Sequence, residues 1–356
     1  IAAALLTVSA THVHFSRMGL NNVQTPLLWV ASFYFLLRGV RTRHLLDWGL
    51  SGLLAGLSLY FYYASRLVPA ILGGFLVYLI LTQRGFLRRQ YVHCAALFLG
   101  GMVAFAPLGL LFAQTPRDLT ARAVDMSVFR NRPRLELRYQ SQETIDLAWR
   151  QVKETALVFY KHGDASSFFE TGKPIVDPWV AALLTVGLAY ATPRWRDPRF
   201  FFLGLWFWAN FLVGGTLSID TPYLPRIVGL LPAVFVFAAI SADRTIKAGS
   251  VLGGRLAGAA GSVGLAVLVV VAAHGDLRLY FGDYARSYPW SISTVQAKYI
   301  ASLGTGYRVL VAGAPVIYFE HGATCFLAHD VQGGNLLHPE VELPVRDLGD
   351  KNLAFL

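Results

Sequence analysis

Residues 92–113 read VHCAALFLGGMVAFAPLGLLFA and contain no Asp, Glu, Lys or Arg. Because about 20 apolar residues of helix cross the hydrocarbon core of a bilayer, this run predicts a membrane-spanning helix. Of the 356 residues, 55% are hydrophobic and 15% are charged, whereas a soluble domain carries roughly a quarter charged residues. An ordinary water-soluble enzyme is therefore excluded.

Eight further apolar runs accompany this one and predict a mainly α, polytopic transmembrane helix bundle over residues 1–273. The nine predicted spans are approximately 1–13, 23–37, 45–63, 67–81, 92–113, 179–191, 200–217, 223–240 and 256–273. Because the chain opens inside an apolar run, we expect it to be a fragment that is cut at both ends and lacks its N-terminal spans.

The loops between these spans alternate in positive charge. The loops after the second, fourth, sixth and eighth spans each hold three cations, and three short loops on the other side hold one arginine each. The first set is Arg38, Arg41, Arg43, Arg84, Arg88, Arg89, Arg194, Arg196, Arg199, Arg244, Lys247 and Arg255. The positive-inside rule predicts that this set is cytoplasmic. The net charge of +10 therefore needs no nucleic-acid partner.

This topology predicts that residues 114–178 and 274–356 lie outside the plasma membrane. In the first segment, Ile145, Trp149 and Val152 begin a run of apolar residues at helical spacing. That spacing predicts an amphipathic helix, which packs either on the membrane surface or on the external domain.

The tail, 274–356, changes in composition and predicts a small α/β domain that is incomplete. A helix-like run at 293–303 is followed by strand-like runs at 307–312 and 325–328, with Gly and Pro between them.

The single arginines of the outer loops are Arg17, Arg66 and Arg226. A guanidinium group suits bidentate binding of phosphate, and three of them around one bundle predict a phosphate or pyrophosphate site at the membrane face. The alternative for any one of them is snorkelling towards the headgroups of membrane lipid.

Polar residues near these arginines are candidates for sugar, acceptor or headgroup contacts. Their alternative role is to cap helices or form turns. The candidates are Asn21, Asn22, His162, Asp164, Lys173, Asp220 and Tyr223.

Cofactor motifs are absent from the sequence. It has no GxxxxGK loop, no HExxH motif and two cysteines, Cys94 and Cys325, far apart. His12 and His14 point away from each other on a helix, so we predict no metal site and no cofactor.

Several motifs together resemble one family. They are ATHVHFSRMGLNN at 10–22, YYASRLVP at 62–69, HGD at 162–164 with PIVDP at 174–178, and PYLPRIVGLLP at 222–232. In this order they resemble lipid-linked-sugar glycosyltransferases of the protein O-mannosyltransferase and aminoarabinose-transferase type, known as family 39. The sequence departs from the family pattern by carrying Asn21 and Asn22 where Asp is frequent.

The resemblance implies a glycosyltransferase C fold. It further implies that a sugar passes from a polyprenyl-phosphate donor in the outer leaflet to an acceptor hydroxyl on a protein, lipid or glycan, with inversion. Arg17 is the best match for binding the donor phosphate, with Arg66 and Arg226 in support and Tyr63 as a further contact. The catalytic Asp of the family is expected before Ile1, which leaves Asp164 and Asp220 as weak candidates in this chain.

Two other functions compete with this one. A transporter or flippase could use the arginines to recognise an anionic substrate, but transporters place charge near the bilayer midplane, and here charge gathers at one face. A non-catalytic scaffold with a partner-binding tail is the third alternative.

Overall fold

The structure is a computed structural model that describes residues 1–166, 168–287, 291–314, 317–344 and 350–356. The chain divides into two compact units, Ile1–Tyr280 and Phe281–Leu356. The first is helical and the second combines helices with a small sheet. The predicted fold class, mainly α with a small α/β part at the C-terminus, is therefore confirmed.

The first unit contains thirteen α-helices among the described residues, and every predicted span coincides with a helical segment. The helices are α1 Ala2–Val8, α2 Ala10–Arg17, α3 Thr25–Thr42, α4 Leu45–Ser58, α5 Leu67–Thr82, α6 Phe86–Gln114, α7 Pro116–Asp125, α8 Arg132–Tyr139, α9 Thr144–Leu157, α10 Pro178–Ala191, α11 Pro198–Ala209, α12 Leu224–Ile227 and α13 Leu231–Arg278.

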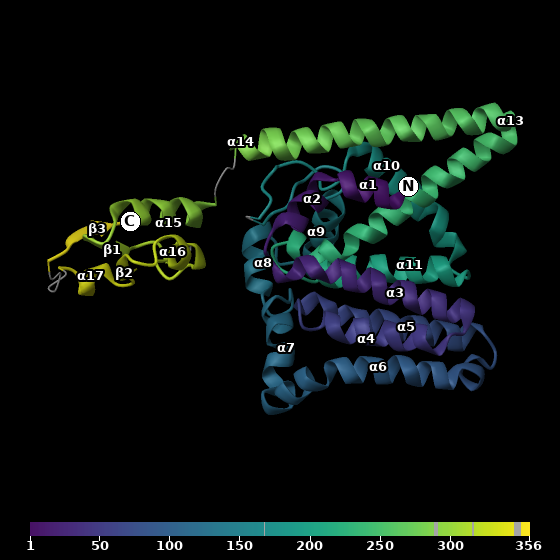
Figure 1. The fold of residues 1–356 in the computed structure, drawn as a ribbon, viewed down its shortest axis with the longest axis horizontal. Helices are drawn as coiled ribbons and strands as arrows, with labels where there is room; N and C mark the ends of the chain where they lie inside the picture. The colour runs from purple at the N-terminus through teal and green to yellow at the C-terminus, as the bar shows by residue number, and fades with distance from the viewer. Residues whose placement is uncertain (167, 288–290, 315–316, 345–349) are drawn as a thin grey trace. The chain divides into compact units, whose positions relative to one another are not determined.

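Short turns of 3-10 or π-helix join several of these helices. They are η1 Asn21–Gln24, η2 Tyr63–Arg66, η3 Thr192–Arg194, η4 Asn210–Thr216, η5 Val228–Leu230 and η6 Leu279–Tyr284. The long helix α13 is two helices, because Gly254 has φ 73° and ψ −168° inside it. Glycine tolerates this left-handed φ, and the chain reverses at this turn (Figure 1).

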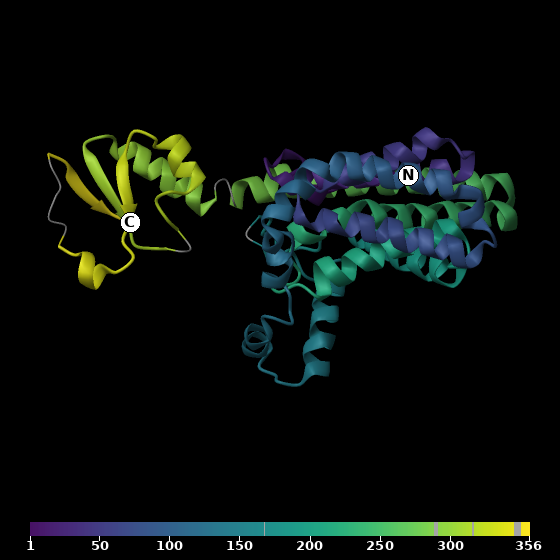
Figure 2. The same cartoon turned by 90° about the horizontal axis from the view of Figure 1, so that it is seen from below.

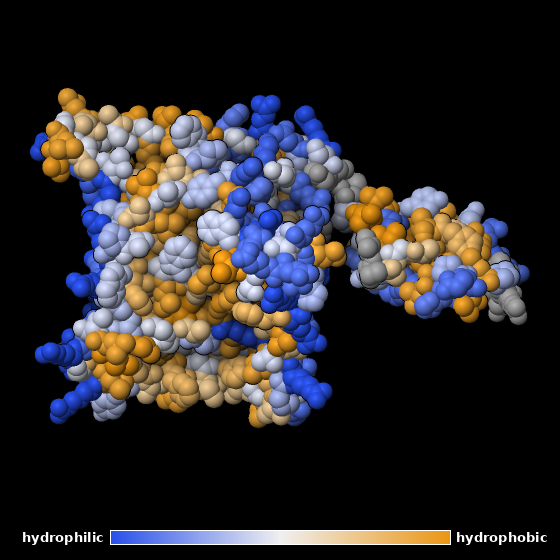
Figure 3. Space-filling model, turned by 180° about the vertical axis from the view of Figure 1, so that it is seen from behind, coloured by the Kyte–Doolittle hydropathy of each residue, from blue (hydrophilic) through white to orange (hydrophobic). Residues whose placement is uncertain are grey.

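Three helical stretches of the described residues are long and apolar enough to cross a membrane. They are Tyr63–Thr82, Phe86–Gln114 and Leu224–Ser287, while Leu45–Ser58 is apolar but shorter. Apolar side chains cover the middle of one face of this unit, and hydrophilic side chains gather at its two ends (Figure 3). This supports an integral membrane protein, and the number of spans stays a prediction.

Helices α3, α4, α5 and α6 lie side by side (Figures 1 and 2). Glycines set the closest approach, that of α4 to α6. A Cβ on Gly52 would lie 1.8 Å from the carbonyl oxygen of Leu97, and one on Gly100 would lie 2.2 Å from that of Gly49. Only glycine fits at these positions, as is common where membrane helices pack closely.

Helix α9 lies within the stretch where an amphipathic helix is predicted. Its buried face consists of Leu147, Gln151 and Thr155, whereas Ile145 and Trp149 are 77% and 64% exposed. The buried face packs against η4, where a Cβ on Gly215 would meet Thr155 at 2.4 Å. Part of the predicted apolar stripe therefore faces away from the bundle.

The second unit has a three-stranded parallel sheet in the order β2-β1-β3. The strands are β1 Tyr307–Val311, β2 Gln332–Asn335 and β3 Asn352–Phe355, and the helices are α14 Ala285–Ser287, α15 Ile292–Leu303, α16 Gly322–Leu327 and α17 Pro339–Glu342. Its buried cluster includes Ile300 from α15 with Val309 and Val311 from β1. Helix α15 and strand β1 thus lie where the sequence predicts a helix and a strand.

The prediction of a strand at 325–328 is wrong, because Gly322–Leu327 form helix α16. A short apolar run does not distinguish helix from strand, and here the helix has a cap. The Nδ1 atom of His321 accepts a hydrogen bond from the backbone N–H of Ala323 at 3.1 Å. The neighbouring strand is β2, whose Gly333 has no room for a Cβ beside the ring of Phe319.

Candidate functional site

The three predicted arginines lie in turns at one end of the first unit. Arg17 ends α2, Arg66 ends η2 and Arg226 lies in α12. Two side-chain hydrogen bonds tie these turns together. Asn22 Nδ2 donates to the carbonyl of Pro225 at 3.1 Å, and Trp29 Nε1 donates to Ser65 Oγ at 3.2 Å.

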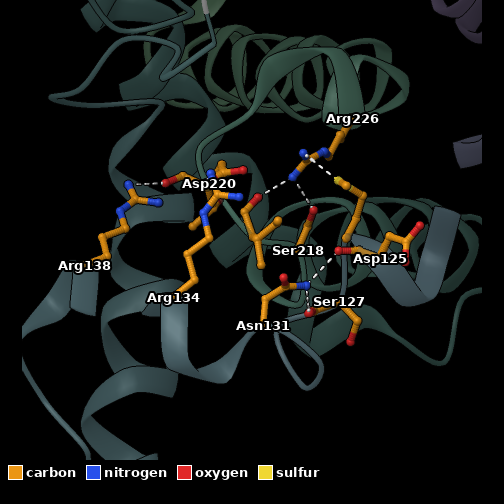
Figure 4. Close-up of polar contacts among 11 residues, drawn as sticks. Asp125, Ser127, Asn131, Arg134, Arg138, Ser218, Asp220 and Arg226 are labelled. Carbon is orange, nitrogen blue, oxygen red and sulfur yellow. Dashed lines mark hydrogen bonds and ion pairs between the residues drawn. The ribbon is translucent and has the colours of Figure 1, made fainter. Parts of the chain in front are cut away.

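Arg226 is buried, with 5% of its surface exposed. Its Nη1 donates to Ser218 Oγ at 2.7 Å and to the carbonyl of Ile219, and its Nη2 contacts Met126 Sδ at 3.1 Å (Figure 4). Its guanidinium also lies 4.2 Å from the centre of the Tyr223 ring. In the described part of the chain the hydrogen bonds of Arg226 go to neutral groups, and the Asp220 carboxylate lies near enough to interact with its charge.

Arg66 is half-buried and is held by the segment that follows α6. Its Nη1 donates to the carbonyl of Leu119 in α7. Its guanidinium lies 5.6 Å from the ring centre of Phe112 and 5.9 Å from that of Tyr63. Such contacts with aromatic faces stabilise a cation without neutralising it.

Arg17 is exposed and its guanidinium lies 5.6 Å from the ring centre of Tyr280. One turn before Arg17 in α2 lies His14, which stacks on Phe169 with ring centres 4.3 Å apart. Burial and, to a smaller extent, the charge of Arg17 lower the pKa of His14 to about 4, although a hydrogen bond with the backbone of Phe168 raises it. This histidine is therefore neutral near pH 7.

Tyrosines surround the buried arginine. Tyr62, Tyr63 and Tyr223 all lie close enough to Arg226 to interact with its charge. Tyr63 also lies beside Arg66, so the ring of this one tyrosine is near the guanidinium groups of both Arg66 and Arg226. On the Arg17 side, Phe168 contacts Tyr223 with ring centres 6.4 Å apart, next to the Phe169 that stacks on His14. The site thus has an Arg66–Arg226 part and an Arg17 part, with the 168–169 segment between them.

Asp164 is buried and holds the turn that bears Arg226. Its Oδ1 accepts hydrogen bonds from the backbone N–H groups of Leu224 at 2.8 Å and Ser166 at 3.0 Å, and its Oδ2 accepts one from the Ser166 hydroxyl. Burial raises the pKa of Asp164 to about 6, although these hydrogen bonds lower it. Asp164, a candidate acid predicted from the sequence, therefore holds the start of α12 at Leu224, two residues before Arg226.

Asp220, the second predicted acid, lies at the edge of the site. It has φ 61°, a left-handed conformation that costs free energy in a residue other than glycine. Its carboxylate pairs with Arg134 Nη2 at 3.0 Å, and Arg138 Nη2 donates to the neighbouring carbonyl of Thr221 at 2.8 Å (Figure 4). Helix α8 thus holds this turn through two arginines.

The other predicted polar residues are spread more widely. Asn21 is exposed in η1, and Asn22 is buried with its amide on Pro225. His162 follows α9, with Nε2 4.0 Å from the Glu154 carboxylate. Lys173 is exposed, and its backbone N–H contacts Thr171 Oγ1.

Several residues of the site were not predicted from the sequence. Met126, Ser218 and Ile219 hold Arg226, and Arg134 and Arg138 hold the Asp220 turn. The sequence contains no signal for these contacts, since Met126 and Arg226 are 100 residues apart. Tyr62 could have been found, because it stands beside Tyr63 in the motif at 62–69.

No group of three His, Cys, Asp or Glu side chains able to hold a metal ion occurs within the described ranges. The side chains and turns described above supply fixed positive charge, aromatic rings and backbone groups. Such groups can bind a phosphate and stabilise the negative charge that develops on it when a bond to it breaks.

Comparison with known proteins gives one match. Residues 1–110 match the model of the family described as dolichyl-phosphate-mannose-protein mannosyltransferase. No curated protein and no solved structure matches the chain significantly. The matched range includes Arg17 and Arg66 and ends inside α6. Over residues 1–110, the chain is therefore similar to the dolichyl-phosphate-mannose-protein mannosyltransferases, and this confirms the predicted resemblance over the range that contains the motifs at 10–22 and 62–69.

Proposed function

We propose that this chain transfers a sugar from a polyprenyl-phosphate donor to an acceptor hydroxyl at the outer face of the membrane, with inversion at the anomeric carbon. The observation that carries the proposal is Arg226, a buried cation whose hydrogen bonds among the described residues go to neutral groups, beside the tyrosines of a membrane bundle. The family match over residues 1–110 supports the same reaction class.

In this reaction the acceptor oxygen attacks the anomeric carbon, and the bond from that carbon to the phosphate oxygen breaks. The electron pair of the broken bond goes to the phosphate, whose added negative charge Arg226 stabilises from a fixed position. Arg66 and Arg17 add positive charge at the same end of the bundle. The acceptor proton goes to a carboxylate. We expect this base to be an Asp before Ile1, with Asp164 and Asp220 as the candidates inside the chain.

A flippase for a lipid-linked anion is the alternative proposal. The polar groups described above gather at one end of the helices, which favours chemistry on a donor at the membrane surface over passage through the bundle. A flippase would move a fluorescent polyprenyl phosphate across a vesicle membrane without forming a glycosylated product.

The test is transfer of labelled sugar by the full-length protein in nanodiscs, comparing the parent with Arg17→Ala. We expect Arg17→Ala to abolish transfer and leave the melting temperature unchanged, since its side chain is exposed. The matched control is Arg194→Ala, which removes another arginine that stacks on a tyrosine, 3.7 Å from the Tyr190 ring centre. Equal turnover in both variants would refute the donor-phosphate role of Arg17.

A further inference from the structure

Helix α9 has three faces of different chemistry, which follow one another around its axis. One face packs on the bundle, the second is charged and the third is apolar. In that order they consist of Leu147, Gln151 and Thr155, then Asp146, Arg150 and Lys153, then Ile145, Trp149, Val152 and Ala156. A helix that lies between protein and water needs two faces, so the third face indicates a third environment.

The apolar face of α9 carries its largest side chains where they are most exposed. Ile145 is 77% and Trp149 is 64% exposed, although both are apolar. Tryptophan is enriched where a membrane meets water, because its ring is apolar and its one N–H needs a polar partner. The charged face beside it can stay in water, where Arg150 Nε donates to the Asp146 carboxylate at 2.9 Å. These features are typical of a helix that lies in a membrane interface.

The C-terminal end of α9 reaches the side of α10. Tyr160, which follows the apolar face at helical spacing, donates from its hydroxyl to Thr185 Oγ1 at 2.8 Å, since the Thr185 hydroxyl itself donates to the carbonyl of Ala181. Thr185 lies about 10 Å along α10 from Pro178, at about 1.5 Å per residue, and is exposed, as is the neighbouring Val186. Because α10 lies within a predicted span, this exposed side of α10 faces lipid. The apolar face of α9 therefore continues a lipid-facing surface.

The opposite side of α9 packs on the segment that holds Arg226. Thr155 Oγ1 lies 3.1 Å from Thr221 Oγ1 and 3.4 Å from Thr216 Oγ1. The segment 216–221 also supplies the hydroxyl and the carbonyl that accept hydrogen bonds from Arg226. Since close-packed elements transmit displacements to one another, a shift of α9 moves the groups that fix this guanidinium.

We propose that the apolar face of α9 docks into the interface of the surrounding phospholipid bilayer, and that this contact holds the segment 216–221 in place around Arg226. The apolar face then lies among the glycerol groups and the first carbons of the acyl chains, and the charged face lies in water. The docking itself is independent of the reaction. The effect on Arg226 rests on the proposed function, because it is measured as sugar transfer.

Fluorescent labels on two faces of α9 test the docking. In full-length protein with Cys94 and Cys325 replaced by serine, Trp149→Cys or Lys153→Cys is labelled with a nitrobenzoxadiazole fluorophore and placed in nanodiscs. We expect the label at 149 to emit at shorter wavelength and to be quenched by phospholipid brominated on its acyl chains. The label at 153, on the charged face of the same helix, should instead be quenched by iodide in the water. Equal quenching of both labels, by iodide or by brominated lipid, would overturn the docking.

A pair of charge changes tests the effect on the site. Trp149→Glu places a carboxylate in the lipid-facing surface, where a charge is costly, whereas the matched control Lys153→Glu places one in water. We expect Trp149→Glu to lower kcat for sugar transfer about tenfold in nanodiscs and Lys153→Glu to leave it unchanged. Trp149→Phe, which keeps an apolar ring, should transfer at the parent rate. Equal kcat in the two glutamate variants would overturn the effect on Arg226. The expected label pattern in a protein that transfers no sugar would support the docking and refute the proposed function.

Discussion

The turn that carries Arg226 and the turn that carries Arg66 hold the same kind of side chain in different ways. Arg226 is 5% exposed and its guanidinium contacts Ser218, Ile219 and Met126, whereas Arg66 is half-buried and, among the described residues, donates to one backbone carbonyl. The guanidinium group of Arg226 is therefore held in place before a ligand binds, whereas that of Arg66 can move to meet a ligand. A rigid cation suits a charge that develops during reaction, and an adaptable one suits capture of a ligand.

Removal of Arg226 tests the rigid side of this comparison and has the largest expected effect among the substitutions that bear on the Arg226 and Arg66 turns. Arg226→Ala leaves Ser218 and Ile219 without their donor and removes the charge beside the tyrosines. We expect sugar transfer to fall about 100-fold to 1,000-fold in kcat, by analogy with the loss of one donor to a developing anion. The melting temperature should fall as well, because a buried hydrogen-bonded network is broken.

Arg226→Lys serves as the control for charge alone. Lysine keeps the positive charge but lacks the planar guanidinium group with its several N–H donors, so we expect a kcat between those of the parent and Arg226→Ala. Transfer at the parent rate in Arg226→Ala would contradict the comparison, because the buried cation would then have no part in the reaction.

Asp164 tests how firmly the Arg226 turn is held, through the pH dependence of stability. Its pKa rises from 3.8 in the unfolded chain to about 6 in the folded protein, so the folded state binds its proton more tightly. The contribution of Asp164 to stability is then complete below about pH 4 and is lost as pH rises to about 6, by about 3 kcal/mol, at about 1.4 kcal/mol per pKa unit. Above pH 6 this contribution is constant.

Asp164→Asn removes the titrating group and keeps one oxygen for the N–H groups of Leu224 and Ser166. Denaturation midpoints measured between pH 4 and pH 7 should then lose the decrease that the parent shows. A slope that is the same in parent and variant would mean that another group causes it.

Arg66→Ala tests the adaptable side and has the smallest expected effect. Because its side chain is half-buried and donates to the carbonyl of Leu119, which water can replace as a partner of the guanidinium, we expect the melting temperature to stay within measurement error. We expect the KM for the donor to rise about tenfold and kcat to change little, as for a group that contributes equally to the ground and transition states. A fall in kcat as large as that of Arg226→Ala would show that the two arginines act alike.

The sequence predicted the helical segments of the bundle well, because long apolar runs have few alternatives to helix in a membrane. Short runs are different. The four residues 325–328 fit a strand as well as a helix, and the bond from Ala323 to His321 decided for the helix. Strand β2, Gln332–Asn335, has no strand-like residues and forms because β1 lies beside it.

By itself the sequence determined that this is a helical membrane protein, which resembles polyprenyl-phosphate-dependent glycosyltransferases and carries three arginines at the ends of its predicted spans. Hydropathy and loop charge are local properties, so they can be read along the chain. Only the tertiary structure decided that Arg226 is buried on Ser218 and Met126, that Asp164 holds its turn, and that α9 packs on the segment 216–221. These contacts join residues up to 100 positions apart, and they depend on how the helices pack rather than on which residues form helices.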